Sequence, residues 1–245
     1  MSETKMNQTN RVANEIEHGK YLSVSPDEFW GWSGKAGRLR LERRARMLSG
    51  GVSGKVLEIG CGAGLYTTEF SQADIDLTSI DVSPDLIKLA RENVPPERNV
   101  VFRIEDAHKT SFPDCSFDAI IGSSVLHHLE LELALREFLR ILKPGGIIKF
   151  TEPNYLNPQI ALLMSHPFFR KRFHVSPDET AFFKWKLQQD LLFQGFSEVN
   201  IINFDFLHPQ TPESLSLTLN KLTLILEKVP ILKEISGSLF ITARK

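Results

Sequence analysis

The sequence predicts an α/β fold with a mostly parallel β-sheet and helices on both of its faces. From residue 55 onward, short apolar runs alternate with segments of helical periodicity, which is the pattern of repeated strand–helix–strand units. Continuously apolar runs of this length are typical of strands that are buried on both faces. The expected parallel strands cover residues 56–59, 77–80, 100–104, 117–122 and 147–151.

Local signals define the helices between these strands. Residues 63–72 have helical spacing. The helix after the second strand is expected to have Ser83 as its N-cap and Pro84 at its first position. A third helix is predicted at 131–142, because it is followed by Lys-Pro-Gly-Gly at 143–146, which is a helix stop signal and a turn.

The region after residue 154 predicts the remaining strands. Residues 197–206 and 238–243 are expected to form a hairpin-like pair, which completes a seven-stranded sheet with an antiparallel edge strand. Helical periodicity precedes this pair at 178–194. A Leu-rich helical stretch, interrupted at Pro230, separates its two strands.

The length of 245 residues suits one large domain with a lid better than two independent domains. Residues 1–50 are expected to form a mostly helical N-terminal lid, and residues 51–245 the main domain. Within that domain, two segments are interpreted as inserts after the fifth and sixth strands. They cover about residues 155–177 and about residues 209–236.

Composition and charge exclude several classes of protein. The formal net charge of −1 does not fit the basic balance of a nucleic-acid binder. The two cysteines, Cys61 and Cys115, cannot make a disulfide framework, and no Cys-x-x-Cys pair or other ligand pair suggests a metal. We therefore expect a cytoplasmic protein without a bound metal. The N-terminus lacks the apolar core of a signal peptide, and no segment approaches the roughly 20 apolar residues of a membrane span.

Unusual residues gather after the expected strands, at the edge of an open α/β sheet where ligands bind. Gly60, Gly62 and Gly64 follow the first strand, in which Glu58 lies. Glycines at such a turn allow the chain to reverse tightly and a ligand to approach the backbone. The third glycine of the dinucleotide fingerprint would fall at Leu65, so the spacing differs from that motif.

Two carboxylates extend this pattern. Asp81 ends the second expected strand, where a carboxylate can bind both hydroxyls of a ribose. Asp106, followed by the small Ala107, ends the third, where an acceptor can face the exocyclic amine of a purine. Each residue alone is equally compatible with a turn or a loop cap. Together with the glycines, in this order, they favour an adenosine-shaped ligand.

Four segments resemble successive motifs of class I S-adenosylmethionine-dependent methyltransferases. They are VLEIGCGAG, IDVSPDLIKLAREN, EDAHKTSFPDCSFDAIIGSSVLHHL and LKPGGIIKFTEPN. The sequence is most similar to the small-molecule "type 11" branch, which includes the ubiquinone and menaquinone C-methyltransferases. The resemblance covers about residues 54–154 and is specific for the cofactor and the fold, but not for the acceptor. It implies a Rossmann-like methyltransferase domain with S-adenosylmethionine as its cofactor.

The resemblance also implies roles for individual residues. The glycines would lie against the methionine and ribose portions, Glu58 would help to hold the methionine ammonium from beneath the loop, and Asp81 would bind the ribose hydroxyls. Cys61 is interpreted as a packing residue of this loop and not as a nucleophile. The implied cofactor-binding set is Glu58, Gly60, Cys61, Gly62, Gly64, Asp81, Val82, Asp106, Ala107, Ser123 and Ser124.

The cofactor's sulfonium already carries an activated methyl group, so the protein mainly positions the acceptor and excludes water. A general base is needed only where the acceptor is a hydroxyl or an acidic carbon of high pKa. His127 and His128, just past the fourth strand, are the candidate catalytic residues, with His127 ahead. The alternative is that both histidines cap the next helix or pack beneath it.

Aromatic residues ahead of the first glycine motif are candidate lid residues. Aromatic faces suit a sulfonium through cation–π attraction, although they would equally pack an N-terminal helix on the sheet. The cluster consists of Tyr21, Phe29, Trp30 and Trp32, of which Tyr21 and Trp30 are candidate substrate contacts. Asn154 and Tyr155, after the fifth strand, are further candidate contacts of the acceptor.

The inserts leave the acceptor open. Both inserts cover a sheet edge or form a dimer contact, or they build an apolar pocket for a lipid, quinone, polyketide or lipid-linked sugar. Peripheral contact with an anionic membrane through residues 170–172, Arg-Lys-Arg, is a third interpretation. The arginine-rich segment 38–46 is interpreted as a solvated helix face, or alternatively as a binding site for a phosphate or carboxylate of the substrate.

We therefore expect methyl transfer from S-adenosylmethionine to a small-molecule acceptor, by a monomer or homodimer without a nucleic-acid partner. Two alternatives of other classes remain open, a cofactor-binding regulator without turnover and a nucleotide-dependent oxidoreductase. Methylation of a protein or nucleic acid is a third possibility, within the enzyme class. The neutral charge weighs against nucleic acid, as does the absence of an Asn-Pro-Pro-Tyr-type motif after the fourth strand, where the sequence reads SSVLHH.

Overall fold

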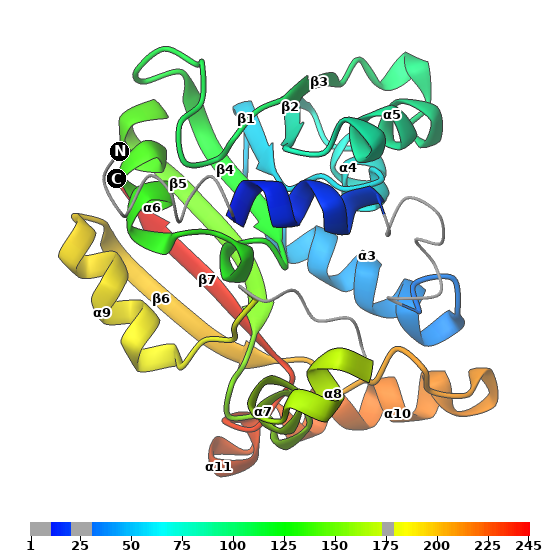
Figure 1. Cartoon of the computed structure of the whole chain (residues 1–245). Helices are drawn as coiled ribbons and strands as arrows, with labels where there is room; N and C mark the ends of the chain where they lie inside the picture. The colour runs from blue at the N-terminus through cyan, green and yellow to red at the C-terminus, as the bar shows by residue number, and fades with distance from the viewer. Residues whose placement is uncertain (1–10, 21–30, 173–178) are drawn as a thin grey trace.

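A computed structural model describes residues 11–20, 31–172 and 179–245 of the chain (Figure 1). The described residues form one seven-stranded sheet with the order β3-β2-β1-β4-β5-β7-β6. Its strands are β1 (Gly54–Ile59), β2 (Ile75–Asp81), β3 (Val101–Ile104), β4 (Phe117–Ser123), β5 (Leu142–Pro153), β6 (Ser197–Phe204) and β7 (Ser238–Arg244). The predicted fold class is confirmed.

The sheet is parallel except for one strand. β1 pairs in parallel with β2 and β4, and the parallel pairing continues to β3 on one side and to β5 on the other. β7 is antiparallel to both of its neighbours, β5 and β6. The reversed strand therefore lies one position inside the edge, because β6 returns along its outer side.

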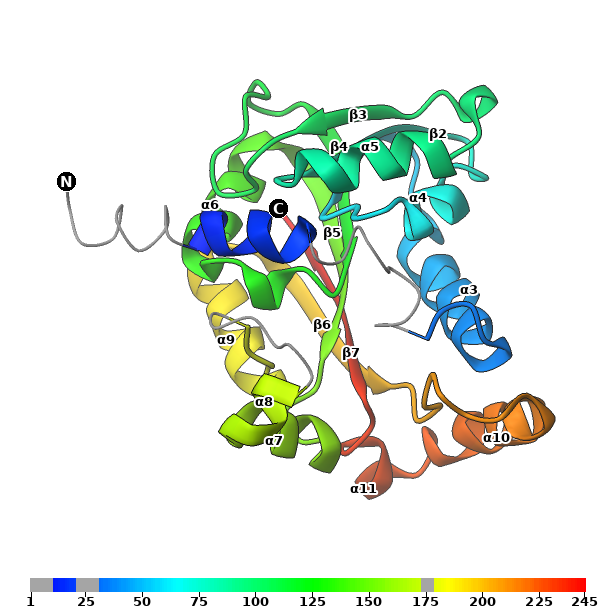
Figure 2. The same cartoon turned by 45° about the vertical axis from the view of Figure 1, so that its right-hand side comes forward.

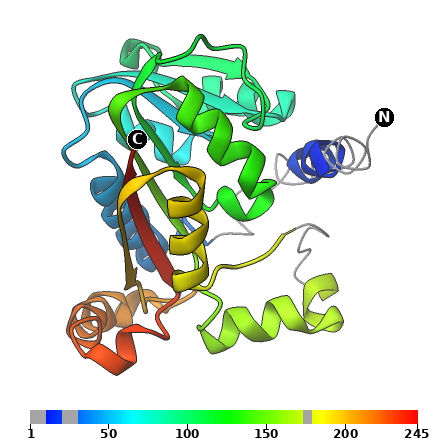
Figure 3. The same ribbon diagram turned by 90° about the vertical axis from the view of Figure 1, so that its left-hand side faces the viewer.

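Helices cover both faces of the sheet, as Figure 3 shows with α3 and α9 on opposite sides. The flanking helices are α3 (Lys35–Ser49), α4 (Leu65–Phe70), α5 (Pro84–Asn93), α6 (Leu131–Ile141) and α9 (Lys184–Gln194). Alternate residues of a strand point to opposite faces, so Val56 packs with Leu48 of α3, whereas Leu57 packs in the cluster that holds Phe138 of α6. This alternation produces two apolar layers, one on each face.

Local signals explain where several helices begin. The Ser83 hydroxyl accepts from the Leu86 backbone N–H, and Pro84 is the first residue of α5, as predicted. The prediction of a helix over 178–194 is wrong at its start, since α9 begins at Lys184. Phe182 instead donates its backbone N–H to Pro153 and accepts from Tyr155, so this stretch extends beside the end of β5. Residue 178 lies outside the described residues.

The inserts contain helices at one end of the molecule (Figures 1 and 2). The first holds α7 (Pro158–Ser165) and α8 (Pro167–Arg172), and the second holds α10 (Glu213–Leu226) and α11 (Pro230–Lys233). Pro230 interrupts the second insert by starting a new helix, because proline fits the first helical turn but not a helix interior. Residues 11–20 form an additional helix, drawn in dark blue.

A membrane-spanning helix is not found among residues 11–20, 31–172 and 179–245, since none of their helices is both long and apolar enough.

Candidate functional site

Two neighbouring cavities lie along the carboxyl ends of the strands. The glycine-loop cavity, of about 210 Å³, is lined by the loop after β1, by the ends of β2 and β4, and by the helix of residues 11–20. The insert cavity, of about 350 Å³, lies between α3, α7 and the chain that follows β6. Trp32 and Ser124 line both cavities, so the two spaces meet at these residues.

Gly60 and Gly62 have different reasons to lack a side chain. Both have positive φ angles, +67° and +52°. A Cβ on Gly60 would lie 2.5 Å from a methyl carbon of Val125, so packing excludes it. A Cβ on Gly62 would meet no protein atom within 4 Å, because it would project into open space at the glycine-loop cavity. Gly62 therefore presents bare backbone to that cavity.

Asp81 joins this loop to the end of β2. Its Oδ2 accepts from the backbone N–H of Gly62 at 3.0 Å, and its Oδ1 accepts from that of Ser83 at 2.9 Å. Burial raises the pKa of Asp81, and the two backbone hydrogen bonds oppose this shift. Each carboxylate oxygen keeps a second lone pair, which suits it to accept from a ligand hydroxyl at the cavity wall.

Glu58 supports the loop from beneath and does not line the cavity. Its side chain is buried, and Oε2 accepts from the hydroxyls of Thr67 at 2.6 Å and Ser79 at 2.7 Å. Burial raises its pKa to about 7. Cys61 is buried nearby, and burial likewise raises the pKa of its thiol, which makes it a poor nucleophile.

The end of β3 differs from the sequence expectation in one residue. Ala107 lines the glycine-loop cavity, but Asp106 does not, since its Oδ1 accepts from the backbone N–H of His108 and lies 2.5 Å from His108 Nδ1. Glu105 lines the cavity instead. Of the implied cofactor-binding set, the residues that line this cavity are Gly60, Cys61, Gly62, Asp81, Val82, Ala107, Ser123 and Ser124.

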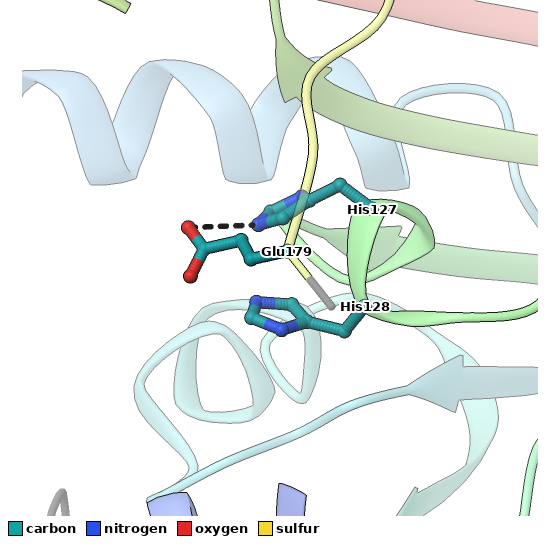
Figure 4. A group of neighbouring side chains, drawn as sticks. All are labelled: His127, His128 and Glu179. Atoms are coloured by element: carbon teal, nitrogen blue, oxygen red, sulfur yellow. Dashed lines mark ion pairs between the residues drawn. The ribbon is translucent and has the colours of Figure 1, made fainter. Parts of the chain in front are cut away.

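The loop after β4 carries the two candidate histidines (Figure 4). Buried His127 lines the insert cavity, and its Nδ1 lies 2.6 Å from Oε2 of Glu152. The other oxygen of Glu152 accepts from the backbone N–H groups of Val125 and Leu126. Because a carboxylate only accepts hydrogen bonds, Nδ1 of His127 is the donor to Glu152, and its Nε2 lies 3.7 Å from Oε1 of Glu179.

His128 belongs to the other cavity. It lines the glycine-loop cavity, where its Nδ1 lies 3.2 Å from Oε1 of Glu15. Burial would lower its pKa, but the carboxylates of Glu15, Glu179 and Glu152 together outweigh burial and raise the pKa. Ligand atoms of His127, His128 and Glu179 lie within 4.8 Å of one another, a donor set that a divalent metal could use. The expectation of no metal therefore stays a prediction.

Two of the four candidate substrate residues line neither cavity, although Pro153 and Asn157 beside them line the insert cavity. The Asn154 side chain is buried and donates to the backbone carbonyls of Glu234 and Ser236, and Tyr155 packs on Phe183 with ring centroids 4.7 Å apart. The structure thus gives these two residues structural roles at the end of β5. Tyr21 and Trp30 lie outside the described residues.

Sequence reasoning gave an apolar pocket built by the inserts as one alternative, but it did not identify the individual residues that line the insert cavity. Apolar residues of α7 form part of the wall of this cavity, and charged side chains form another part. The interpretation of 38–46 as a solvated helix face is wrong for Arg40 and Arg44, because their side chains pair with buried Asp205 across the cavity wall. In the helix of residues 11–20, Glu15 and His18 had no sequence signal that assigned them to a cavity.

Comparison with known proteins identifies the family. Residues 57–150 match the family model described as a methyltransferase domain. A demethylmenaquinone methyltransferase from Tropheryma whipplei is 30% identical over 181 residues, which cover 71% of this chain and 70% of the relative. The 2-methyl-6-phytyl-1,4-hydroquinone methyltransferase from Synechocystis sp. is 35% identical over 101 residues, 40% of this chain. Those residues span only 32% of that relative's length.

A solved structure shares the fold. It is the N-methyltransferase NodS from Bradyrhizobium japonicum in complex with S-adenosylhomocysteine, with a TM-score of 0.62 and 19% identity. The match covers 95% of this chain and 98% of NodS. The match to the methyltransferase-domain family model and to the Tropheryma whipplei relative shows that the chain belongs to the type 11 branch of the class I S-adenosylmethionine-dependent methyltransferases. The bare backbone at Gly62 and the carboxylate of Asp81 fit the family's cofactor, S-adenosylmethionine.

Proposed function

We propose that the protein transfers a methyl group from S-adenosylmethionine to a small molecule held in the insert cavity. The observation that carries this proposal is the meeting of the two cavities at Trp32 and Ser124. The glycine-loop cavity takes the cofactor, which supplies an activated methyl group when bound. An acceptor in the insert cavity would then approach along the shared border, and Trp32 would help to exclude water there.

The acceptor class follows from the wall of the insert cavity. Ile160, Leu163 and Met164 of α7 form an apolar side, with Leu207 from the chain after β6. Such a wall suits an acceptor with an apolar body. The names of the two relatives point the same way, since a demethylmenaquinone and a phytyl hydroquinone each combine a ring with an apolar chain. These acceptors are assigned to the relatives and not to this chain.

His127 is the proposed general base for a hydroxyl acceptor. Glu152 holds its Nδ1–H, so in the neutral imidazole the lone pair of Nε2, which lies 3.7 Å from Oε1 of Glu179, can take a proton from the acceptor hydroxyl. Backbone N–H groups of Val125 and Leu126 fix Glu152 in turn. This support from a buried carboxylate keeps one tautomer and one orientation of the imidazole ring.

A methyl-transfer assay with His127→Asn tests both parts of the proposal. The amide of asparagine can still donate to Glu152 but offers no nitrogen base at the Nε2 position. With hydroxyl acceptors, including hydroquinones with alkyl chains, wild-type protein should form S-adenosylhomocysteine, and the variant's kcat should fall about 10²- to 10⁴-fold. Binding of S-adenosylhomocysteine should not change.

Two results would contradict the proposal. Wild-type kcat in His127→Asn would reduce His127 to a packing residue. Tight binding of S-adenosylhomocysteine without turnover of any acceptor would favour a cofactor-binding regulator. The control variant is His166→Asn, because His166 lies at the end of α7 and lines neither cavity.

A further inference from the structure

One end of the insert cavity holds two arginines that share a single carboxylate. Arg40 and Arg44 lie one turn apart on α3, and both contact Asp205 just after β6. Nε of Arg40 lies 2.9 Å and Nη2 of Arg44 lies 2.6 Å from the same oxygen, Oδ2. The side chains of Arg44 and Asp205 are only 6% and 4% exposed, so solvent screens this cluster weakly.

The neighbouring ion pair, between Arg43 and Glu227, supplies no negative charge to Arg40 or Arg44. Arg43 donates to both carboxylate oxygens of Glu227, at 2.7 Å and 2.5 Å, and so forms a bidentate pair of its own. Glu227 also accepts from the backbone N–H of Asp205. Arg40 and Arg44 therefore share the single negative charge of Asp205, which leaves a local excess of one positive charge at this pair. Glu179, another carboxylate of the cavity wall, contacts His127.

Arg40 has N–H groups that are not used in hydrogen bonds to the described residues. Its Nε donates to Asp205, whereas its Nη1 and Nη2 donate to no group within residues 11–20, 31–172 and 179–245. The side chain is 15% exposed and lines the insert cavity. The Trp32 ring lies 5.6 Å from the guanidinium carbon and limits its movement on one side. These N–H groups are partly exposed, and a charged acceptor from a ligand would form stronger hydrogen bonds with them than neutral groups do.

The electrostatic environment of His208 agrees with this excess of positive charge. His208 lines the same cavity beside Arg40. Burial lowers its pKa, and the positive charge of Arg40 lowers it further. The positive charge of Arg40 therefore acts on another residue that lines the cavity.

We infer that Arg40, with Arg44 behind it, forms an oxyanion-binding subsite of the insert cavity. The ligand group is a carboxylate or a phosphate, because a planar guanidinium matches either with two parallel hydrogen bonds. The apolar wall from Ile160, Leu163 and Met164 receives the rest of the ligand. The acceptor is thus an amphiphile with an anionic group; this last step rests on the proposed function.

Calorimetric titration of the S-adenosylhomocysteine-saturated protein tests the subsite directly. The probes are octanoate, octyl phosphate and, as the uncharged control, octanol. Octanoate or octyl phosphate should bind about 10-fold or more tightly than octanol, which corresponds to one charge-assisted hydrogen-bond pair. A preference between the two anions distinguishes a carboxylate from a phosphate ligand.

Two variants connect the binding to Arg40. Arg40→Met keeps an apolar stem but removes the charge, and it should lower anion affinity about 10-fold. Arg46→Met is the matched control, because Arg46 lies on the same helix with its side chain 71% exposed. Arg40→Lys keeps the charge without the planar fork and should retain intermediate affinity.

These binding measurements test the subsite without requiring methyl transfer. Equal binding of octanol and octanoate by wild-type protein would overturn the subsite, as would wild-type anion affinity in Arg40→Met. If the anions bind through Arg40 but do not inhibit methyl transfer, the subsite stands and the acceptor assignment of the cavity fails. Circular dichroism and S-adenosylhomocysteine affinity establish that each variant is folded.

Discussion

The backbone N–H of Gly62 donates a 3.0 Å hydrogen bond to Oδ2 of Asp81, which joins the loop after β1 to the end of β2. One residue of this pair presents bare backbone to the glycine-loop cavity, and the other presents a carboxylate. Ser83 holds the second carboxylate oxygen and also caps α5. The geometry of the cofactor site therefore depends on contacts between two neighbouring parallel strands.

Replacing Asp81 should weaken cofactor binding and leave the fold intact. In Asp81→Ala the ligand hydroxyls lose a charged acceptor, so the Kd for S-adenosylhomocysteine should rise about 10- to 100-fold. Isothermal titration calorimetry measures this change. Asp76→Ala, at an exposed position of the same strand, should bind as wild type does. Unchanged affinity in Asp81→Ala would remove this residue from the site.

Alanine substitutions at Gly60 and Gly62 should distinguish an effect on packing from an effect on ligand binding. Gly62→Ala should cost about 1–2 kcal/mol of stability through its positive φ, and it should also weaken S-adenosylhomocysteine binding because the methyl group enters the cavity. Gly60→Ala should be more destabilising, since its Cβ would lie 2.5 Å from Val125. Thermal unfolding and calorimetry compare the two. Wild-type affinity in Gly62→Ala would show that the ligand does not approach this backbone.

Glu152→Gln tests whether the tautomer of His127 matters. The glutamine carbonyl can still accept from Val125 and Leu126, but its amide would face Nδ1 as a donor. The proton of His127 would then move to Nε2, and the proposed base would be lost. The kcat for hydroxyl acceptors should fall about 10²- to 10⁴-fold, as in His127→Asn. A kcat close to that of wild type would refute the role of this pair.

Glu58 should make folding stability depend on pH. Its folded pKa of about 7 lies above the ordinary value of 4.5, so the folded state binds the proton more tightly. The resulting stabilisation is fully present below about pH 4.5 and is lost as the pH rises through about 7, with a magnitude of about 3 kcal/mol. Urea unfolding at about pH 5 and about pH 8 measures it. Glu58→Gln should flatten this part of the pH profile, and an unaltered profile would exclude Glu58 as the cause.

Asp205→Asn should destabilise the protein strongly. Asp205 is the shared partner of Arg40 and Arg44, and its loss leaves two largely buried guanidinium groups uncompensated. A loss of about 3–5 kcal/mol in the free energy of unfolding is expected. Glu198→Gln removes the exposed partner of Arg244 and should change stability by less than about 1 kcal/mol. Equal effects of the two substitutions would contradict the burial argument.

The fold was predictable because its signals are local. Apolar runs that end in glycine or aspartate mark β1 and β2, and the Ser83-Pro84 pair marks the start of α5. The start of α9 was not predictable in this way. Its boundary at Lys184 depends on hydrogen bonds between Phe182 and the end of β5, which join residues distant in the sequence.

The cofactor cavity was more predictable than the insert cavity for the same reason. Gly62 and Asp81 lie in motifs whose spacing along the chain implies their proximity. Arg40, Ile160 and Asp205 come from three distant segments, and only the folded chain brings them to one cavity. Asp106 shows a further limit, because its neighbour Glu105 faces the cavity while Asp106 itself contacts His108.

Calorimetric titration of the wild-type protein with S-adenosylhomocysteine tests the central claim most directly. The cavity formed by the glycine loop and Asp81 predicts binding at a single site per chain, with no comparable binding of a nicotinamide dinucleotide. Absence of heat and of any thermal shift with S-adenosylhomocysteine or S-adenosylmethionine, in a protein that is folded, would contradict the assignment of this cavity to the cofactor.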